Sequence, residues 1–375
     1  MRLKIFSVGA RHAVPLLCLL LLFVGFASAQ ESVSDARLWQ VFLQRNTDGE
    51  GSDLLVFIDM LTGNEVGLAV RGSRYTPFGR YVMFLDAVDN RVKLAAPDGR
   101  VQEHPFIQPQ SGSRRIDWWV SPNAQHVAWT QTFGENATQL TTETWVSTGT
   151  GANLRSVLAD GPRDGIRALP VAFSDDGATL YLDYQPDSIS DLLPLRQFAG
   201  LFAVDLTAGT TANLPDEPGC YCGAGIGGGR LLRLTLTSDL TGYDLQVYNL
   251  ADNTKTTIRA LSLAGYSQAG EILISPDGTR AAYALAEVED FGGDEETVRS
   301  AVVLVDLLAM TQTALDRPLS TFVQPVAWTE DNTAVVFAAS ASQAGGDGTW
   351  KINFVDGRVD RIARASYLGA IRIPS

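Results

Sequence analysis

The chain is poor in the residues that usually build thiol and metal chemistry, because its 375 residues include three cysteines and three histidines. Only His104 and His126 remain once residues 1–29 are set aside, which excludes a centre built on three histidines. A serine-hydrolase elbow, Gly-x-Ser-x-Gly with a later histidine, is lacking too. The nearest string, at 265–270, is one residue too long, and both histidines precede it. The sequence therefore disfavours both of these enzyme classes.

Basic residues and long apolar runs are also scarce. Lys and Arg together number 29, against 42 Asp and Glu, and the formal net charge is −13. Binding to nucleic acid needs a basic footprint, so we expect no nucleic-acid partner. Beyond the N-terminal segment, no apolar run approaches the roughly 20 residues that cross a bilayer. We therefore expect no membrane span.

The N-terminal segment has the pattern of a cleaved signal peptide. Its apolar run, 16–26, is too short to span a bilayer. The run lies between basic residues and a small-residue cleavage site, namely Arg2, Lys4 and Arg11 before it and Ala27-Ser28-Ala29 after it. We expect residues 1–29 to be removed on export to the periplasm or the extracellular space. The mature chain would then begin at Gln30.

Two short patterns recur along the rest of the chain. The first is a tight turn followed by an apolar strand, and it reads Val-Ser-Pro-Asn-Ala at 120–124, Phe-Ser-Asp-Asp-Gly at 173–177, Ile-Ser-Pro-Asp-Gly at 274–278, Trp-Thr-Glu-Asp-Asn at 328–332 and, in a decayed form, Tyr-Thr-Pro-Phe-Gly at 75–79. The second is an alternating apolar strand that ends in a Gly, Asn or Asp turn, at 55–63, 92–99, 144–149, 201–209, 245–250, 302–307 and 350–357. Alternation with a period of two predicts strands, and the repeat length predicts a radial or stacked fold.

Each repeat unit accounts for four strands. The seven units that we expect cover 36–70, 73–107, 114–158, 165–214, 219–259, 268–317 and 321–364. They predict an all-β fold, a seven-bladed β-propeller of four-stranded antiparallel blades, which forms a single domain over 30–375. The first unit begins at a second strand, 38–43, and a spare strand, 368–373, follows the last unit. We expect this C-terminal strand to complete blade one, because a ring must hide its edges.

These two patterns resemble the TolB-like, WD40-like (PD40-type) propeller repeats. Such repeats occur in the propeller of TolB and in the propeller domains of prolyl-oligopeptidase-like peptidases. The resemblance covers nearly the whole mature chain and implies an architecture rather than an activity. TolB carries a mixed α/β domain ahead of its propeller, for which we expect no room here. The resemblance is therefore not to TolB itself, and TolB's lipoprotein partner is not carried over.

The variation in length falls between the second and third strands of each unit, at 44–53, 86–91, 131–143, 185–199, 238–243, 286–300 and 339–348. Because strands alternate in direction, these connections should share one face, and variable loops on a rigid scaffold often carry binding. The predicted ligand- or partner-binding residues are Asp187, Asp191, Glu287, Glu289, Asp290, Asp294, Glu295 and Glu296. Their negative field favours a cationic ligand or protein partner. The alternative is that these acidic loops only keep an exported protein soluble.

Two smaller motifs leave alternatives open. Asn46, Asp48, Glu50 and Asp53 resemble part of a calcium loop, although the bidentate acid that ends an EF-hand loop is missing, and the alternative is a solvated Gly-rich hairpin. Cys220 and Cys222 are an even pair in an oxidising compartment. They either form a small, strained disulfide or remain thiols packed as small apolar groups. We expect no cofactor other than calcium.

The function that the sequence favours is an exported, non-catalytic and monomeric propeller, which serves as a protein- or ligand-binding scaffold through its acidic face. The alternative is an extracytoplasmic hydrolase or lyase with carboxylates at the mouth of the propeller channel. An enzyme of that kind should show two or more convergent carboxylates in a deep channel pocket.

Overall fold

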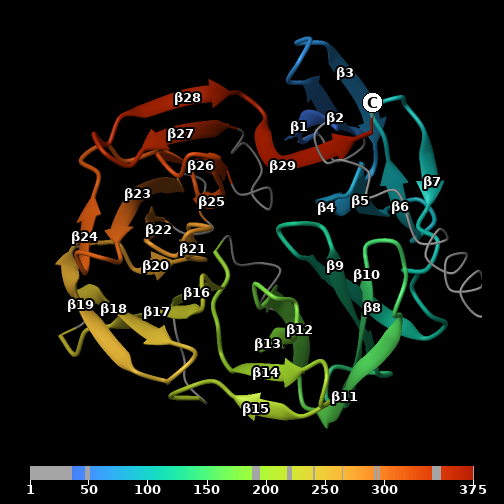
Figure 1. Ribbon diagram of the computed structural model, residues 1–375, viewed down its shortest axis with the longest axis horizontal. Helices are drawn as coiled ribbons and strands as arrows, with labels where there is room; N and C mark the ends of the chain where they lie inside the picture. Colours follow the sequence, from blue (N-terminus) through green and yellow to red (C-terminus); the bar gives the residue numbers. More distant parts are fainter. Residues whose placement is uncertain are drawn as a thin grey trace, which may run out of the picture.

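The computed structural model describes residues 36–46, 51–187, 195–217, 222–239, 241–263, 265–290, 293, 296–339 and 348–374. Within these residues the chain forms strands and no helix, and the strands build seven antiparallel sheets that are arranged as a ring (Figure 1). The predicted seven-bladed β-propeller is therefore confirmed. None of the described segments forms an apolar helix of bilayer-spanning length.

The strands of each blade follow one another outward from the centre of the ring. Blades one and two contain β29 (Ser366–Ile373), β1 (Arg37–Gln44), β2 (Asp53–Asp59) and β3 (Glu65–Val70), then β4 (Gly72–Phe78), β5 (Tyr81–Asp86), β6 (Val92–Ala95) and β7 (Val101–Glu103). Blades three and four contain β8 (Ser113–Val120), β9 (His126–Phe133), β10 (Leu140–Thr148) and β11 (Arg155–Arg163), then β12 (Ile166–Phe173), β13 (Thr179–Pro186), β14 (Leu201–Asp205) and β15 (Thr211–Asn213).

Blades five to seven complete the ring. They contain β16 (Gly223–Gly227), β17 (Arg230–Leu236), β18 (Gly242–Asn249) and β19 (Lys255–Ser262), then β20 (Gln268–Ala269) with β21 (Leu273–Ile274), β22 (Arg280–Glu289), β23 (Thr297–Asp306) and β24 (Thr311–Ala314), then β25 (Val323–Trp328), β26 (Ala334–Ala339), β27 (Thr349–Asn353) and β28 (Val359–Ala363). The predicted units match these sheets, and the differences lie at strand ends.

The recurring Ser-Pro-Asp-Gly pattern forms a turn that is held by its own side chains. In blade six the hydroxyl of Ser275 donates to Oδ1 of Asp277 at 2.6 Å, and the same oxygen accepts the N–H of Thr279 at 3.0 Å. These hydrogen bonds, that from Ser275 first, hold the pKa of Asp277 at about 2. Gly278 has a φ of 67°, which glycine adopts without strain. The corresponding residues of blades four and seven make the same contacts.

The C-terminal strand closes the ring, as predicted. β29 pairs with β1 along the register Arg37↔Ile373 to Leu43↔Ser366, and it forms the innermost strand of blade one (Figure 1). Ile371 of β29 is 1% exposed and joins the apolar core that blade one shares with Val82 and Phe84 of blade two. The first and last blades therefore meet without an exposed innermost edge.

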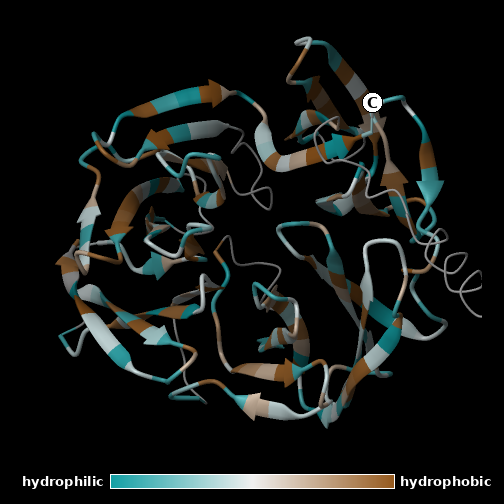
Figure 2. Cartoon of the chain, in the orientation of Figure 1, coloured by the Kyte–Doolittle hydropathy of each residue, from teal (hydrophilic) through white to brown (hydrophobic). Residues whose placement is uncertain are grey.

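Apolar side chains fill the space between neighbouring blades. Brown and teal bands alternate along many strands in Figure 2, as expected for strands that bury one set of side chains. Trp129 lies in the core between blades two and three, and Trp350 in the core between blades six and seven, so both fill the space between neighbouring blades. Trp118 and Trp119 pack into the cores on opposite sides of blade three.

Candidate functional site

The connections between the second and third strands lie on the same face of the ring as the links between blades. The N–H of Gly165, in the link before β12, donates to the carbonyl oxygen of Ala137, in the connection between β9 and β10, at 2.7 Å. The N–H of Asp187, which follows β13, donates to the carbonyl oxygen of Gly165 at 2.8 Å. We call this side the loop face. The innermost strands begin there, because each follows a link between blades.

A buried network of charged side chains lies at the loop-face end of the innermost strands. Arg167, at the start of β12, has no exposed surface. Its Nη1 lies 2.8 Å from Oδ2 of Asp117 in β8, and its Nε lies 2.9 Å from Oδ1 of Asp187. Asp117 and Asp187 are themselves 5% and 6% exposed. Arg167 therefore joins blade three to blade four through buried charge.

Arg74 adds blade two to this network. Its φ is 59°, and β4 shifts register between Ser73 and Thr76. This bulge aims the guanidinium at Oδ1 of Asp117, with which it forms an ion pair. Two hydrogen bonds of 3.0 Å fix the bulge, because Trp118 Nε1 donates to Thr76 Oγ1 and that hydroxyl donates to the carbonyl oxygen of Arg74. The strained position of Arg74 is thus held by its surroundings.

Arg114 and Arg115 are neighbours in β8, yet both reach Asp187. Successive residues of a strand normally point to opposite faces, but β8 shifts register between Ser113 and Arg115. Nη2 of Arg114 lies 3.4 Å from Oδ2 of Asp187, and Nη1 of Arg115 donates to the carbonyl oxygen of Asp187 at 3.0 Å. Bulges commonly redirect side chains beside functional sites. Bulges in β4 and β8 therefore bring arginines to one place.

The arginines keep a buried carboxyl ionised. Burial alone would raise the pKa of Asp117, but the guanidinium groups of Arg74 and Arg167 outweigh burial and lower that pKa below its usual range. Burial lowers the pKa of Arg167, although arginine stays protonated in proteins. Buried ion pairs are often no more stabilising than apolar side chains of similar volume. We therefore interpret this network as a device that positions arginines.

One connection on the loop face contacts blades that are not adjacent to its own blade. Residues 195–200, which lead from the connection after β13 into β14, contact blade five and also blades six and seven. Leu195 packs against Ala286 of β22 and Phe322 before β25, while Phe198 packs into the core between blades four and five. We call these residues the crossing segment, and in Figure 1 the chain runs from near the centre of the ring into β14. The crossing segment ties blade four to the far side of the ring.

Asp183 of β13 anchors the crossing segment. Its carboxylate, which has no exposed surface, accepts the N–H of Gly200 at 2.9 Å and that of Ala199 at 3.2 Å, and also the side-chain amide of Gln185. Burial raises the pKa of Asp183 to about 6, although these hydrogen bonds act in the opposite direction. The group that holds the crossing segment therefore titrates close to neutral pH.

Arg196 places a positive charge within the crossing segment, and this charge acts to lower the pKa of carboxyls in three blades. Burial raises the pKa of Glu271, which lies between β20 and β21 of blade six, and Arg196 opposes that rise. Arg196 acts in the same direction on Asp183 in blade four and on Asp117 in blade three. Electrostatics thus link the crossing segment to the arginine network.

The predicted acidic binding residues lie in several different settings. Asp187 belongs to the arginine network, whereas Glu287 and Glu289 lie within β22. The prediction that 286–300 is entirely a loop is therefore wrong, because the facing pair Val288 and Val298 continues the pairing of β22 with β23. For the same reason, part of the predicted connection 131–143 belongs to β9 and β10.

The remaining acidic residues are described only in part. Nη1 of Arg299 lies 3.2 Å from Oε2 of Glu287, so this carboxylate has a basic partner across the two strands. Asp290 follows β22 directly, with a φ of 53°, and Glu296 directly precedes β23. The residues that lie outside the described part of the chain are Asp191, Asp294 and Glu295. Arginines also lie at the loop-face end of the innermost strands, so acidic residues do not make up the whole of that face.

The calcium and disulfide predictions also fall partly outside the described residues, at Asp48, Glu50 and Cys220. The bridge to Cys222 therefore stays a prediction. The carboxylate of Asp53 accepts the N–H of Asn46 at 3.0 Å and the hydroxyl of Tyr75 at 2.8 Å, and so it links blades one and two. Among the described residues, no three His, Cys, Asp or Glu side chains gather as metal ligands would.

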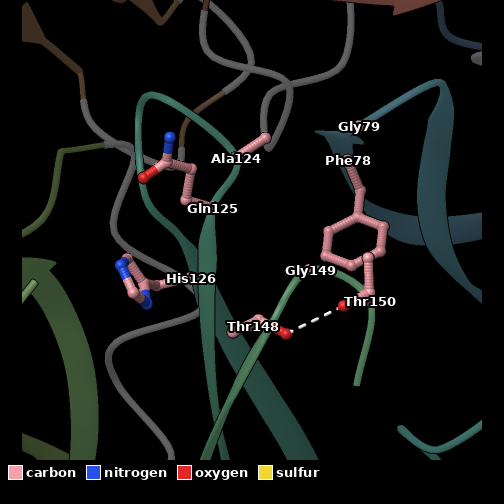
Figure 3. A pocket seen from close by; sticks show the side chains of 8 residues that line it. All are labelled: Phe78, Gly79, Ala124, Gln125, His126, Thr148, Gly149 and Thr150. Carbon is pink, nitrogen blue, oxygen red and sulfur yellow. Dashed lines mark hydrogen bonds between the residues drawn. The ribbon is translucent and has the colours of Figure 1, made fainter. Parts of the chain in front are cut away.

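The opposite face carries a groove of about 510 Å³ between blades two and three. It is lined by Phe78, Gly79, Ala124, Gln125, His126, Thr148, Gly149 and Thr150 (Figure 3). His126 is the one titratable residue of this lining, and Figure 3 shows its ring on the other side of its strand from Phe78. His104 is 2% exposed, and burial lowers its pKa to about 4. These histidines occupy packing positions, so we place the candidate site on the loop face.

Sequence reasoning missed the arginine network, although one signal for it is present. The innermost strand of blade three reads Ser-Arg-Arg-Ile-Asp-Trp-Trp-Val over β8. Three charged residues in a strand that is expected to be buried indicate partners of opposite charge nearby. Asp187 is the one predicted binding residue that the structure brings into this network.

No protein-family model and no curated protein sequence matches the chain. Among solved structures, a prolyl endopeptidase from a study of two such enzymes is similar with a TM-score of 0.57 and 12% identity, and the match covers 90% of this chain and 51% of that chain. A provisional 6-phosphogluconolactonase from Bacteroides uniformis gives a TM-score of 0.51 and 14% identity, and the match covers 90% of this chain and 100% of that chain. TolB from Acinetobacter baumannii gives a TM-score of 0.43 and 14% identity, and the match covers 76% of this chain and 64% of that chain.

The propeller fold that the resemblance implied is confirmed. This chain spans about half the length of the prolyl endopeptidase that it matches. At identities of 12% to 14%, the likeness shows the fold alone. The neighbours also differ in the activities that their names give, so a function has to be argued from the residues of this chain.

Proposed function

We propose that the protein is an exported, non-catalytic propeller that binds a ligand or a partner protein on its loop face. One observation carries this proposal. Charged side chains from the innermost strands of three neighbouring blades meet at Asp117 and Asp187, at the loop-face end of those strands. Stability alone does not require such a buried network, and loops on a rigid scaffold are a common location of binding sites.

The binding residues that we propose are of two kinds. The first is the arginine network on blades two to four, which includes Asp187. The second is the predicted acidic rim of blade six, with Glu287, Glu289, Asp290 and Glu296 as its described members. The protein would act as a monomer, because β29 already completes blade one within a single chain.

The carboxylates near the channel mouth support binding rather than catalysis. Asp117 and Asp187 are each paired with arginine, and Asp183 accepts two backbone N–H groups. An acid or base has to come within hydrogen-bond reach of the substrate. The pKa of Asp183, about 6, is the observation that favours the alternative, a hydrolase or lyase. That alternative predicts a turnover that Asp183→Asn abolishes.

The proposed binding face can be tested by reversing charge on each face. The loop-face variant is Glu289→Lys with Asp290→Lys. The matched control, on the opposite face, is Glu330→Lys with Asp356→Lys, which changes the charge by the same amount at turns of blade seven. Immobilised wild type and both variants would be compared for capture of partners from the native envelope fraction, with and without calcium. We expect the loop-face variant alone to lose capture, with normal folding by circular dichroism.

Equal capture by all three proteins, or a loss confined to the opposite-face variant, would show that we have chosen the wrong face. Export is tested separately. We expect intact-mass analysis of the protein recovered from the envelope or medium to show a mature N-terminus at Gln30. Retention of residues 1–29 in that material would contradict the proposed signal peptide.

A further inference from the structure

We propose that Arg74 and Arg114 bind an oxyanion, a carboxylate or phosphate group of a ligand that enters the channel mouth from the loop face. This inference rests on the proposed function and names the chemistry of a ligand for that face. Negatively charged loops favour a cation, so an anion site is not what the composition of this chain predicts. Four properties of the network favour an anion instead: the bulges, the buried core, the exposure of two arginines, and the chemistry of the guanidinium group.

The two arginines are redirected by bulges at the same end of neighbouring strands. Arg74 lies at the bulge of β4, and Arg114 lies at the bulge of β8. Arg74 also has a backbone conformation that a residue other than glycine seldom adopts. Strain of this kind persists where the surroundings impose it, and it clusters at binding sites. Without the bulges, neither side chain would meet the carboxylates of blades three and four.

The buried part of the network holds the two arginines in place. Arg74 is paired with Asp117 and Arg114 with Asp187, and Arg167 connects these two carboxylates from inside the protein. Each carboxylate is buried and holds one of these two half-exposed arginines, in addition to Arg167. The arginines are therefore preorganised, and ordering them would cost a ligand little binding energy.

The side chains of both arginines still reach solvent. The side chains of Arg74 and Arg114 are 30% and 33% exposed, whereas that of Arg167 is 0% exposed. An arginine has five N–H donors. Arg74 is paired with Asp117. Arg114 is paired with Asp187, and its Nη1 also donates to the carbonyl oxygen of Gly134 at 3.4 Å. These contacts use only some of the donors, so other donors of Arg74 and Arg114 can face a ligand on the loop face. The buried arginine organises the site, and the two half-exposed arginines would contact the ligand.

The guanidinium group selects the class of ligand. Its planar fork matches the two oxygens of a carboxylate or a phosphate, and such pairs form strong, charge-assisted hydrogen bonds. The network already shows this chemistry, because Asp117 lies between the guanidinium groups of Arg74 and Arg167. A ligand oxyanion would make the same kind of contact from the solvent side. Carboxylate and phosphate ligands share this chemistry, and the test below separates them.

The test is calorimetric titration of the full protein with inorganic phosphate and with succinate, in buffers of equal ionic strength. Succinamide, which has the shape of succinate without its charge, is the ligand control. The site variant is Arg74→Gln with Arg114→Gln. The matched control variant is Arg100→Gln with Arg155→Gln, which removes the same charge from blades two and three next to turns of the opposite face. If the site variant unfolds, the single change Arg114→Gln, which leaves the Arg74–Asp117 pair intact, replaces it.

We expect saturable binding of at least one oxyanion, none of succinamide, an affinity at least tenfold weaker in the site variant, and a change of less than twofold in the control variant. Binding of phosphate alone would assign a phosphate ligand, and binding of succinate alone a carboxylate ligand. Absence of saturable binding for both, or equal affinities in the two variants, would overturn the inference. Should that happen while charge reversal on the loop face still abolishes partner capture, the proposed binding face stands and only its anion chemistry falls.

Discussion

Replacement of Arg167 by methionine tests whether the buried network is as interdependent as its geometry indicates. Arg167→Met keeps an unbranched side chain but removes the cation that Asp117 and Asp187 share. Removing one partner of a buried ion pair costs about 3–5 kcal/mol. Asp117 retains Arg74 and Asp187 retains Arg114 after the change. We therefore expect a loss near the lower end, about 3 kcal/mol in the free energy of unfolding.

The assay is urea unfolding, monitored by tryptophan fluorescence. The dependence of the unfolding free energy on urea concentration is compared with that of the wild type, which separates a change in stability from a change in the surface exposed on unfolding. The control is Arg358→Met, whose partner Asp360 lies 2.9 Å away with both side chains largely exposed. Such surface pairs contribute less than about 1 kcal/mol. A loss of that small size for Arg167→Met would refute the interdependence of the network.

A double variant tests whether Arg167 and Asp117 are energetically coupled. Arg167→Met combined with Asp117→Asn removes both the cation and one of the charges that it neutralises. We expect the double variant to be more stable than the sum of the two single losses, because residues in one network are coupled. Additive losses would mean that Arg167 and Asp117 act independently despite the 2.8 Å contact between them.

Three further predictions concern the ring and the crossing segment. Deleting residues 366–375 removes β29 and exposes an edge of β1, so gel filtration should show aggregation, and a normally melting monomer would contradict the closure. Burial raises the pKa of Asp183 to about 6, so between about pH 4 and 6 its carboxyl keeps a proton in the native state that the unfolded chain releases. The free energy of unfolding should therefore fall as pH rises through this window. Asp183→Asn should remove that part of the decline, as measured by urea titrations at several pH values. A side chain at Gly225 would place Cβ 1.9 Å from the carbonyl oxygen of Ile272, so Gly225→Val should destabilise the protein by about 3 kcal/mol or more. Gly67→Ala should lower the free energy of unfolding by less than about 1 kcal/mol. Equal losses for the two variants would refute the close approach at Gly225.

The fold could be predicted from the sequence because its determinants are local and repeated. Each Ser-Pro-Asp-Gly turn is held by hydrogen bonds within five residues, as at Ser275 and Asp277, so the pattern and the structure coincide. The strands can be predicted from the alternation of apolar residues, as in β2, where buried residues alternate with partly exposed ones. Closure by β29 followed from a missing first strand at one end of the repeats and a spare strand at the other.

The site could not be predicted in the same way, because its determinants are distant in sequence. Arg74, Asp117 and Arg167 come from different blades, and they meet only because bulges redirect two of their strands. A bulge moves the register by one residue and leaves little trace in the pattern of apolar positions. The crossing segment has the same difficulty. Nothing in the residues 195–200 indicates that Leu195 would pack against blades six and seven rather than against its own blade.

The acidic residues of the variable loops describe only part of the charge on the loop face, and the net charge of the whole chain describes less of it. A net charge of −13 describes the field far from the protein, whereas a ligand at the surface meets the charges within a Debye length, about 8–10 Å. The acidic rim belongs to blade six and the arginines to blades two to four, which lie on different sides of the ring in Figure 1. Charges separated in this way present two signs on a single face. We therefore expect the proposed binding face to favour a ligand or partner that itself carries both signs, with its anionic group at Arg74 and Arg114 and its cationic part toward Glu289. The closed ring would keep these two regions at a fixed spacing, so the binding face would select for the separation of charges in its partner as well as for their sign.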